Sequence, residues 1–168
     1  VLARDCVRQN FHGLWIQAGY TPLNTLKSTI AFGNTVGSGH DWECAGPVYP
    51  QTQAFNLAMA KYHPEYNKGT PKFNQYGPGD CDAWASGMAF KKAVENANVA
   101  PTAQVTRDEI IHGLSMFKNE TLGGYAPAIT YSDGTKANPH QKCIYLFKWK
   151  GTTYIPVPKG LNKYTCMP

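Results

Sequence analysis

Hydrophobic positions in the middle of the chain recur with the period of an α-helix. Over residues 52–62 apolar side chains return every three or four positions, which predicts an amphipathic helix that ends before Pro64. A second helical pattern covers residues 75–94, where Trp84 and Met88 share one stripe. The pattern therefore predicts two helices joined by a loop.

A third helix start is specified by its polar residues. In the stretch VTRDEIIHGLSMF, Thr106 and Glu109 have the spacing of a capping box, in which each side chain binds the other residue's backbone amide. Gly123 and Gly124 follow, and glycine adopts a positive φ at the lowest energetic cost. We expect a helix that begins after Thr106 and a unit that ends at the two glycines.

Elsewhere the apolar pattern has the shorter period of an extended chain. Strands are predicted over residues 13–20, after a helix in residues 2–10, and over residues 42–45. Residues 126–135 predict a strand and a turn, and residues 143–157 predict a β-hairpin that turns at a Lys-Gly pair. Helices that alternate with strands before a terminal hairpin indicate an α/β layered fold.

Composition and charge narrow the class of protein. The chain has 168 residues with a 42% hydrophobic share, which is enough for a buried core, and it contains no run of 18 apolar residues that would span a membrane. It opens without Met and without a signal-peptide pattern, so we expect a processed or truncated piece whose precursor carries the signal peptide. The net charge is +5 with scattered Lys and Arg, which argues against nucleic-acid binding.

The cysteines are widely spaced and include no CxxC pair, which favours disulfides in an oxidising compartment. Cys143 and Cys166 flank the predicted hairpin and are the favoured pair, while Cys6 and Cys44 flank the first strands and are further disulfide candidates. Other connectivities stay open, because spacing does not determine pairing. The odd total of five leaves at least one thiol free or paired with chain outside this sequence.

The string GDCD raises the question of a reactive thiol. A nucleophilic cysteine needs a nearby base and an orienting group, whereas the carboxylates that flank Cys81 disfavour a thiolate. We interpret Asp80 as the helix cap, Asp82 as a complement to the helix dipole, and Cys81 as a buried residue or half of a disulfide. A cysteine-dependent enzyme on a flavodoxin-like sheet remains the alternative.

Other chemical motifs are weak. The strings HDWEC at residues 40–44 and HQKC at residues 140–143 hold metal-ligand types, but neighbours on a strand face opposite sides, so neither forms a one-sided cluster by itself. The sequence has no Gly-rich phosphate loop, GxSxG or HExxH motif. We therefore expect no catalytic residue, no metal and no cofactor. Asn119 begins a three-residue match to the glycosylation sequon.

The order of elements resembles the C-terminal half of a type I periplasmic solute-binding protein of the branched-chain amino acid ABC importer group. The resemblance rests on VRQNFHGLWIQAGYTP, AFNLAMAKYHPEYN, QYGPGDCDAWASGMAFKKAV, TRDEIIHGLSMFKNETLGGYAPAITYSDG and the closing CIYLFKWKGTTYIPV. It implies three-layer α/β/α, Rossmann-like lobes in an incomplete C-terminal fragment. Residues 1–50 and 141–168 would form part of the C-terminal lobe, and residues 51–140 part of the N-terminal lobe.

The resemblance also implies a function. Such a protein binds a small organic solute, for example an amino acid, an amide or an aromatic acid, between two lobes and delivers it to an ABC permease in the membrane. It lies in the periplasm or outside the cell and catalyses no reaction. The partners would be the solute, the permease, and the missing N-terminal half of the same protein or a second copy. An extracellular ligand-binding sensor domain is the alternative with the same fold.

The family's ligand contacts fall on a small set of positions. The contact after the first strand falls at Ala18, Gly19 or Tyr20, of which we select Gly19 and Tyr20, and the aromatic before the long helix falls at Tyr76. Amino-acid binders place a carboxylate after that strand, whereas this chain reads QAGYT. The resemblance therefore favours an aromatic or other carboxylate solute over an α-amino acid.

Overall fold

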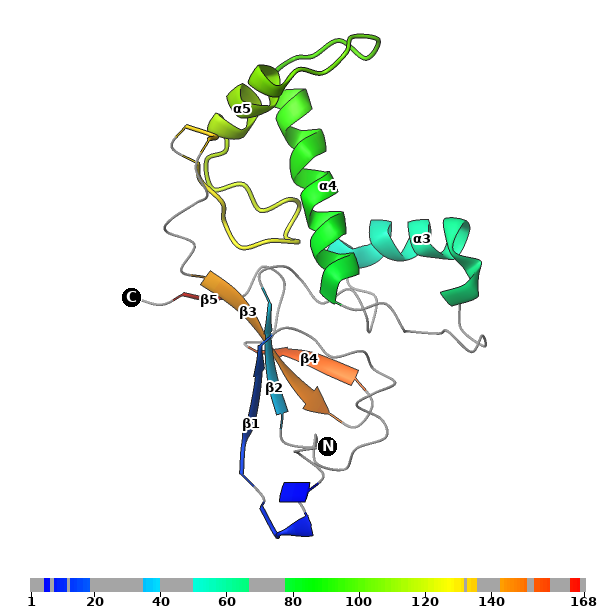
Figure 1. Ribbon diagram of the computed structural model, residues 1–168, viewed down its shortest axis with the longest axis vertical. Helices are drawn as coiled ribbons and strands as arrows, with labels where there is room; N and C mark the ends of the chain where they lie inside the picture. The colour runs from blue at the N-terminus through cyan, green and yellow to red at the C-terminus, as the bar shows by residue number, and fades with distance from the viewer. Residues whose placement is uncertain are drawn as a thin grey trace.

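The protein combines one β-sheet with a group of helices. A computed structural model describes residues 5–6, 8–11, 13–18, 35–39, 50–66, 78–131, 133–135, 143–150, 153–157 and 164–166. Figure 1 shows the sheet in the lower part of the molecule and the helices in the upper part. The mixture of helices and strands agrees with the predicted α/β class.

The sheet has five strands, in the order β1-β2-β3-β4, with β5 paired to β3. β1 and β2 are parallel, and each other pair is antiparallel. The strands are β1 (Trp15–Ala18), β2 (Thr35–Gly39), β3 (Cys143–Lys150), β4 (Thr153–Val157) and β5 (Thr165–Cys166). All five come from the two end regions of the chain. The assignment of these regions to one lobe, and of residues 51–140 to another, stays a prediction.

The predicted terminal hairpin is confirmed. β3 and β4 pair in antiparallel register, with Lys150 opposite Thr153. Pro156 stands opposite Phe147. Proline donates no ladder hydrogen bond, and it is tolerated here because β4 ends the sheet path.

The other predicted strands agree with the structure only in part. The strand predicted over residues 13–20 is confirmed by β1, whereas residues 42–45 lie outside the described residues. The strand predicted in residues 126–135 is wrong: the chain there makes one isolated bridge, in which Glu120 and Ile129 exchange backbone hydrogen bonds of 2.9 and 2.7 Å. Pro127 has no amide hydrogen with which to continue a ladder, and this limits the pairing.

The helices follow the sequence pattern closely. α3 (Gln53–Tyr62) lies between two short 3-10 turns, η2 (Pro50–Thr52) and η3 (Pro64–Tyr66). α5 (Arg107–Ser115) begins with the predicted capping box, since the Glu109 amide donates to Thr106 Oγ1 at 3.3 Å and the Thr106 amide donates to Glu109 Oε2 at 2.8 Å. Gly123 and Gly124 have φ of 69° and 88°, as expected at the end of that unit.

One predicted cap needs correction. α4 (Pro78–Asn96) begins two residues before Asp80, so Asp80 lies in the first turn and is not the N-cap. Proline suits the first helical position, because its φ is already helical and the missing amide hydrogen would have no helical partner. The Asp80 carboxylate still lies near the positive end of the helix dipole.

The hydrophobic core joins the helices to the sheet. Its buried members come from α3, α4, the segment after α5, and β3, and they include Phe55, Cys81, Phe117, Tyr125, Tyr145 and Phe147. The Tyr145 hydroxyl donates a 3.0 Å hydrogen bond to the Gly124 carbonyl oxygen inside this core. Strand β3 is therefore fixed to the segment after α5 by packing and by a buried polar contact.

The disulfides differ in part from the sequence expectation. Cys143 and Cys166, the favoured pair, stand opposite each other on β3 and β5 and are bonded. Cys6 carries a free thiol, so the further candidate pairing of Cys6 with Cys44 is not formed. Bonding requires the two Cα atoms to lie within about 7 Å, and strands that are neighbours in sequence do not ensure this. Cys81 is disulfide-bonded, to a partner outside the described residues.

Candidate ligand-binding site

The three ligand contacts that the sequence suggests are flanked by described elements. Gly19, Tyr20 and Tyr76 themselves lie outside the described residues, so their roles stay predictions. β1 ends at Ala18, and α4 begins at Pro78. In Figure 1 the carboxyl ends of β1 and β2 are directed toward the helical part of the molecule, and α4 begins at its lower end. In open α/β sheets, ligands bind at the carboxyl ends of the strands.

A cavity of about 450 Å³ lies between α3 and the first turns of α4. α3 lines it with Phe55, Ala58, Met59 and Tyr62, and α4 lines it with Asp80, Ala83 and Trp84. His63, at the end of α3, also lines it. A volume of this size matches the usual range for small-molecule sites, which is about 300–1,000 Å³.

Helical periodicity explains why these residues line one space. The α3 residues are three or four positions apart, and so are the α4 residues, so each set lies on one face of its helix. Ala58 and Ala83 are the small members of the two stripes. Larger side chains at these two positions would fill the cavity, so the alanines leave the room that a ligand requires.

Aromatic contacts build the inner wall of the cavity. The Phe55 and Trp84 rings meet edge to face, with centroids 5.6 Å apart and an interplanar angle of 78°. Phe55 is 2% exposed and belongs to the core, so this wall is rigidly supported. Trp84 Nε1 is buried, and among the described residues it has no hydrogen-bond acceptor.

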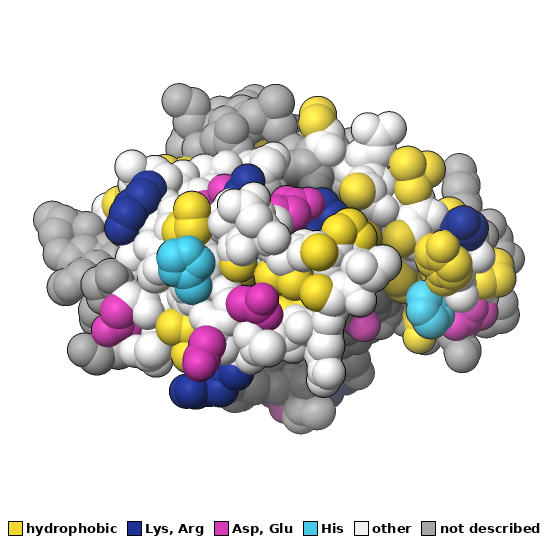
Figure 2. Space-filling model, turned by 90° about the horizontal axis from the view of Figure 1, so that it is seen from above, with side chains coloured by type: hydrophobic (Ala, Val, Ile, Leu, Met, Phe, Trp, Pro, Cys, Tyr) yellow, Lys and Arg dark blue, Asp and Glu magenta, His cyan; other side chains and the backbone are white. Residues whose placement is uncertain are grey.

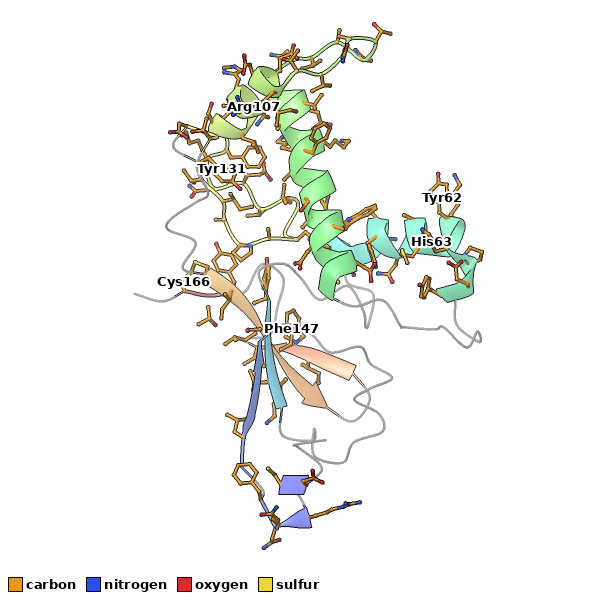
Figure 3. All side chains as sticks on the ribbon, in the orientation of Figure 1. Tyr62, His63, Arg107, Tyr131, Phe147 and Cys166 are labelled. Carbon is orange, nitrogen blue, oxygen red and sulfur yellow. A yellow bond between two sulfur atoms is a disulfide. The ribbon has the colours of Figure 1, made fainter. Side chains whose placement is uncertain are left out.

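The outer end of the cavity is more polar and more exposed. Figure 3 shows Tyr62 and His63 at the outer end of α3, away from α4. Lys61 Nζ lies 4.9 Å from the centroid of the Tyr62 ring, and His63 Nδ1 lies 3.2 Å from Glu65 Oε1. Hydrophobic side chains gather over α3 at the right of Figure 2. The exposed end therefore offers apolar surface together with charged groups.

A second, smaller cavity of about 230 Å³ lies beside the later turns of α4. Its lining includes Lys91, Lys92, Glu95 and Glu120, and Lys91 forms an ion pair with Glu95. The hydrogen bond and charge of Lys91 lower the pKa of the Glu95 carboxyl. None of the described residues that line this cavity is aromatic, so the cavity between α3 and α4 is the better candidate for an organic ligand.

Among the residues that the structure describes, no group of three or more His, Cys, Asp or Glu side chains is arranged to hold a metal ion. Cys81 is fully buried and disulfide-bonded, and so presents no thiolate to a substrate. No helix of the described residues has the length and apolar character needed to cross a membrane.

Sequence reasoning missed the cavity between the two helices. It identified the apolar stripe of α3 and the stripe of α4 with Trp84, but it assigned both to packing. The signal was the small residue within each stripe, Ala58 and Ala83. Only the relative position of the two helices shows that these alanines face the same space.

Comparison with known proteins shows which solved structures have a similar fold. No model of a protein family matches the chain, and no curated protein matches it. A solved structure described as a branched chain amino acid ABC transporter from Thermus thermophilus with bound valine matches 96% of the chain with a TM-score of 0.67. The chain therefore has an α/β fold like that of part of this structure. A protein from Rhodopseudomonas palustris matches 93% of the chain with a TM-score of 0.54.

The extent of these matches limits what they show. Sequence identity is 13% to the Thermus protein and 14% to the Rhodopseudomonas protein, so the likeness concerns the fold alone. The chain covers 42% and 44% of those two chains. It therefore spans less than half the length of the two solved structures that it resembles.

Proposed function

We propose that the protein is the extracytoplasmic solute-binding component of an ABC importer. It binds a small organic solute between two lobes, and the solute is an amino acid, an amide or an aromatic acid. It makes and breaks no bond, and needs no cofactor or metal. Closure of the lobes on the solute gives the permease in the membrane a conformation to recognise, because a ligand with higher affinity for the closed state shifts the population toward it.

One observation carries this proposal. Nearly the whole chain, 96% of it, superimposes on a structure that is described as an ABC transporter protein with bound valine. The disulfide between Cys143 and Cys166 adds support, since disulfides persist in oxidising compartments such as the periplasm. A periplasmic or extracellular location is therefore part of the proposal.

The proposal includes a partner that completes the lobes. The chain covers less than half of the similar structures, and some of its large apolar side chains are exposed, among them Leu57 at 63% and Phe90 at 53%. The N-terminal half of the same protein, or a second copy, would cover such surface. Stable burial of these side chains on association would follow from the hydrophobic effect.

A thermal-shift screen tests the solute-binding role. The full-length protein is heated with a panel of amino acids, amides and aromatic acids, each at about 100 times its expected Kd. A ligand that binds only the folded state stabilises it by about 2.7 kcal/mol at that concentration, which raises Tm by about 5 °C or more. If no solute in the panel changes Tm, the proposed function is wrong.

Matched variants locate the site of the effect. Tyr76→Ala removes the aromatic contact that the family resemblance assigns to the solute, so the shift should disappear. Tyr62→Ala alters the exposed end of the cavity between α3 and α4 and should keep the shift. Equal behaviour of the two variants would contradict a solute site at Tyr76.

A further inference from the structure

The cavity between α3 and α4 has the chemical character of a cation site with an apolar extension. Asp80 and Trp84 are four residues apart on α4, so the carboxylate and the indole lie on the same helix face. Phe55 packs on Trp84 edge to face, which leaves two aromatic rings beside one carboxylate. Aromatic faces and a carboxylate together are the groups that bind an organic ammonium ion.

The charged groups around the cavity are of both signs. Among the described residues of the lining, Asp80 is acidic and His63 is basic, and Glu65 adds a carboxylate whose Oε1 lies 3.2 Å from His63 Nδ1. Lys61 lies beside the lining, over the Tyr62 ring, so this ring already contacts an ammonium group. Lys61 and His63 offset the charge of Glu65, and the Asp80 carboxylate beside the Trp84 ring is therefore the feature that favours a cation.

The rest of the cavity suits an apolar body attached to the charge. From the Asp80 and Trp84 end, the α3 face continues through Met59 to Tyr62, which is 66% exposed. A methionine side chain adapts to the shape of its neighbour, and a tyrosine ring supplies flat apolar contact area. The cavity volume of about 450 Å³ accommodates a ligand of roughly amino-acid size or somewhat larger.

We propose that the groove between α3 and α4 binds small organic cations, with the ammonium head between Asp80 and Trp84 and the apolar body along Met59 and Tyr62. The residues of this groove differ from Gly19, Tyr20 and Tyr76, which the family resemblance assigns to the solute. We expect the cation to bind in addition to the solute.

The test uses the full 168-residue chain and benzyltrimethylammonium as the probe. Its neutral control is benzyl alcohol, and its anionic control is 3-phenylpropionate. Binding is followed by tryptophan fluorescence and by calorimetry. Saturable binding of the cation is expected, with a Kd at least about fivefold lower than that of either control, because one cation–π contact contributes on the order of 1 kcal/mol.

Two variants separate this site from unspecific binding. Asp80→Asn should raise the Kd of the cation by about fivefold or more, whereas Asp108→Asn, an exposed acid in the first turn of α5, should leave it unchanged. Trp84→Phe should abolish the change in tryptophan fluorescence, because Trp84 is the tryptophan among the described residues that line the cavity. A weak calorimetric signal should remain, because phenylalanine keeps an aromatic face.

Several results would overturn the proposal. One is equal affinity for the cation and for benzyl alcohol, and another is an equal effect of Asp80→Asn and Asp108→Asn. A third is concentration-dependent self-association in light scattering that Tyr62→Ser abolishes, with no cation binding, since the groove would then be an interface between copies. Failure of this proposal is distinguishable from failure of the proposed function, because Tyr76→Ala should remove the thermal shift, whereas Asp80→Asn should leave it unchanged.

Discussion

Gly113 of α5 lies directly against the backbone of Ala93 on α4. A methyl group on Gly113 would overlap the Ala93 carbonyl oxygen, and Asn96 Nδ2 on α4 donates a 3.2 Å hydrogen bond to the Gly113 carbonyl oxygen. Both Ala93 and Gly113 are buried. The two helices therefore approach as closely as they do because neither residue has a large side chain at the contact.

Gly113→Ala should lower the free energy of unfolding by about 1–3 kcal/mol, because overpacking forces the two helices apart. The measurement is urea unfolding followed by circular dichroism. Gly87→Ala is the matched control on α4, since no atom lies within 4 Å of the added methyl group and Gly87 is exposed. That control should raise stability by about 0.5–1 kcal/mol, as alanine is the better helix former. Equal loss in both variants would contradict the close contact.

The capping box predicts a specific acid dependence. The hydroxyl and the amide of Thr106 bind the Glu109 carboxylate and hold its pKa below the ordinary value of 4.5. The stabilisation is thus fully present above the unfolded pKa and is lost as pH falls through the folded pKa. Glu109→Gln keeps an acceptor without a charge, so the stability of the wild type should decline more steeply below pH 4.5 than that of the variant.

Thr106→Ala provides the control for this titration. Removing the hydroxyl eliminates the hydrogen bond that lowers the Glu109 pKa most. An NMR titration should therefore show the Glu109 carboxyl protonating at a higher pH in Thr106→Ala than in the wild type. Identical titration curves in the two proteins would refute the contribution of the capping box.

The buried hydrogen bond between Tyr145 and Gly124 predicts a stability loss that packing alone does not explain. Tyr145→Phe keeps the ring in the core but removes the hydroxyl that donates to the Gly124 carbonyl oxygen. The free energy of unfolding should fall by about 1–3 kcal/mol, the usual cost of depriving a buried polar group of its partner. Tyr62→Phe removes an exposed hydroxyl, and its unfolding curve should match that of the wild type.

The cysteine arrangement predicts a defined peptide map. Non-reducing digestion should yield one fragment that joins Cys143 to Cys166. Cys81 is disulfide-bonded and Cys6 is free, so the remaining cysteine of the five, Cys44, should appear joined to Cys81. One thiol per chain should react in denaturant without reductant. A fragment that joins Cys6 to another cysteine would contradict this arrangement.

Local elements of the fold were predictable because their causes lie within a few residues. The period of apolar side chains predicted α3, β1 and the terminal hairpin, and the Thr106 and Glu109 pair predicted where α5 begins. Prediction failed where a distant contact replaced a local preference. Residues 126–135 have strand-like composition, yet Ile129 pairs only with Glu120, and the chain then turns at Asp133, whose carboxylate accepts the Thr135 amide at 2.9 Å.

The candidate cavity, too, could be predicted from the sequence only in part. The apolar stripe of each helix is predictable, since positions three and four apart share one face of a helix. The contact between Phe55 and Trp84 is not predictable in this way, because it joins residues 29 positions apart (84 − 55 = 29) across a loop. The entropic cost of closing a loop varies slowly with its length, so spacing alone carries little information about which faces meet.

Short-range sequence thus specifies where helices and strands begin and end in this protein, through periodicity, capping and glycine. Tertiary packing decided the rest: that Cys6 stays free while Cys81 is bonded, that Gly113 contacts Ala93, and that two alanines leave a cavity between α3 and α4. The physical reason is the separation in sequence of the residues that each interaction joins. Backbone hydrogen bonds in helices and turns link near neighbours, whereas disulfides, close helix contacts and cavities require the whole chain to bring distant residues together.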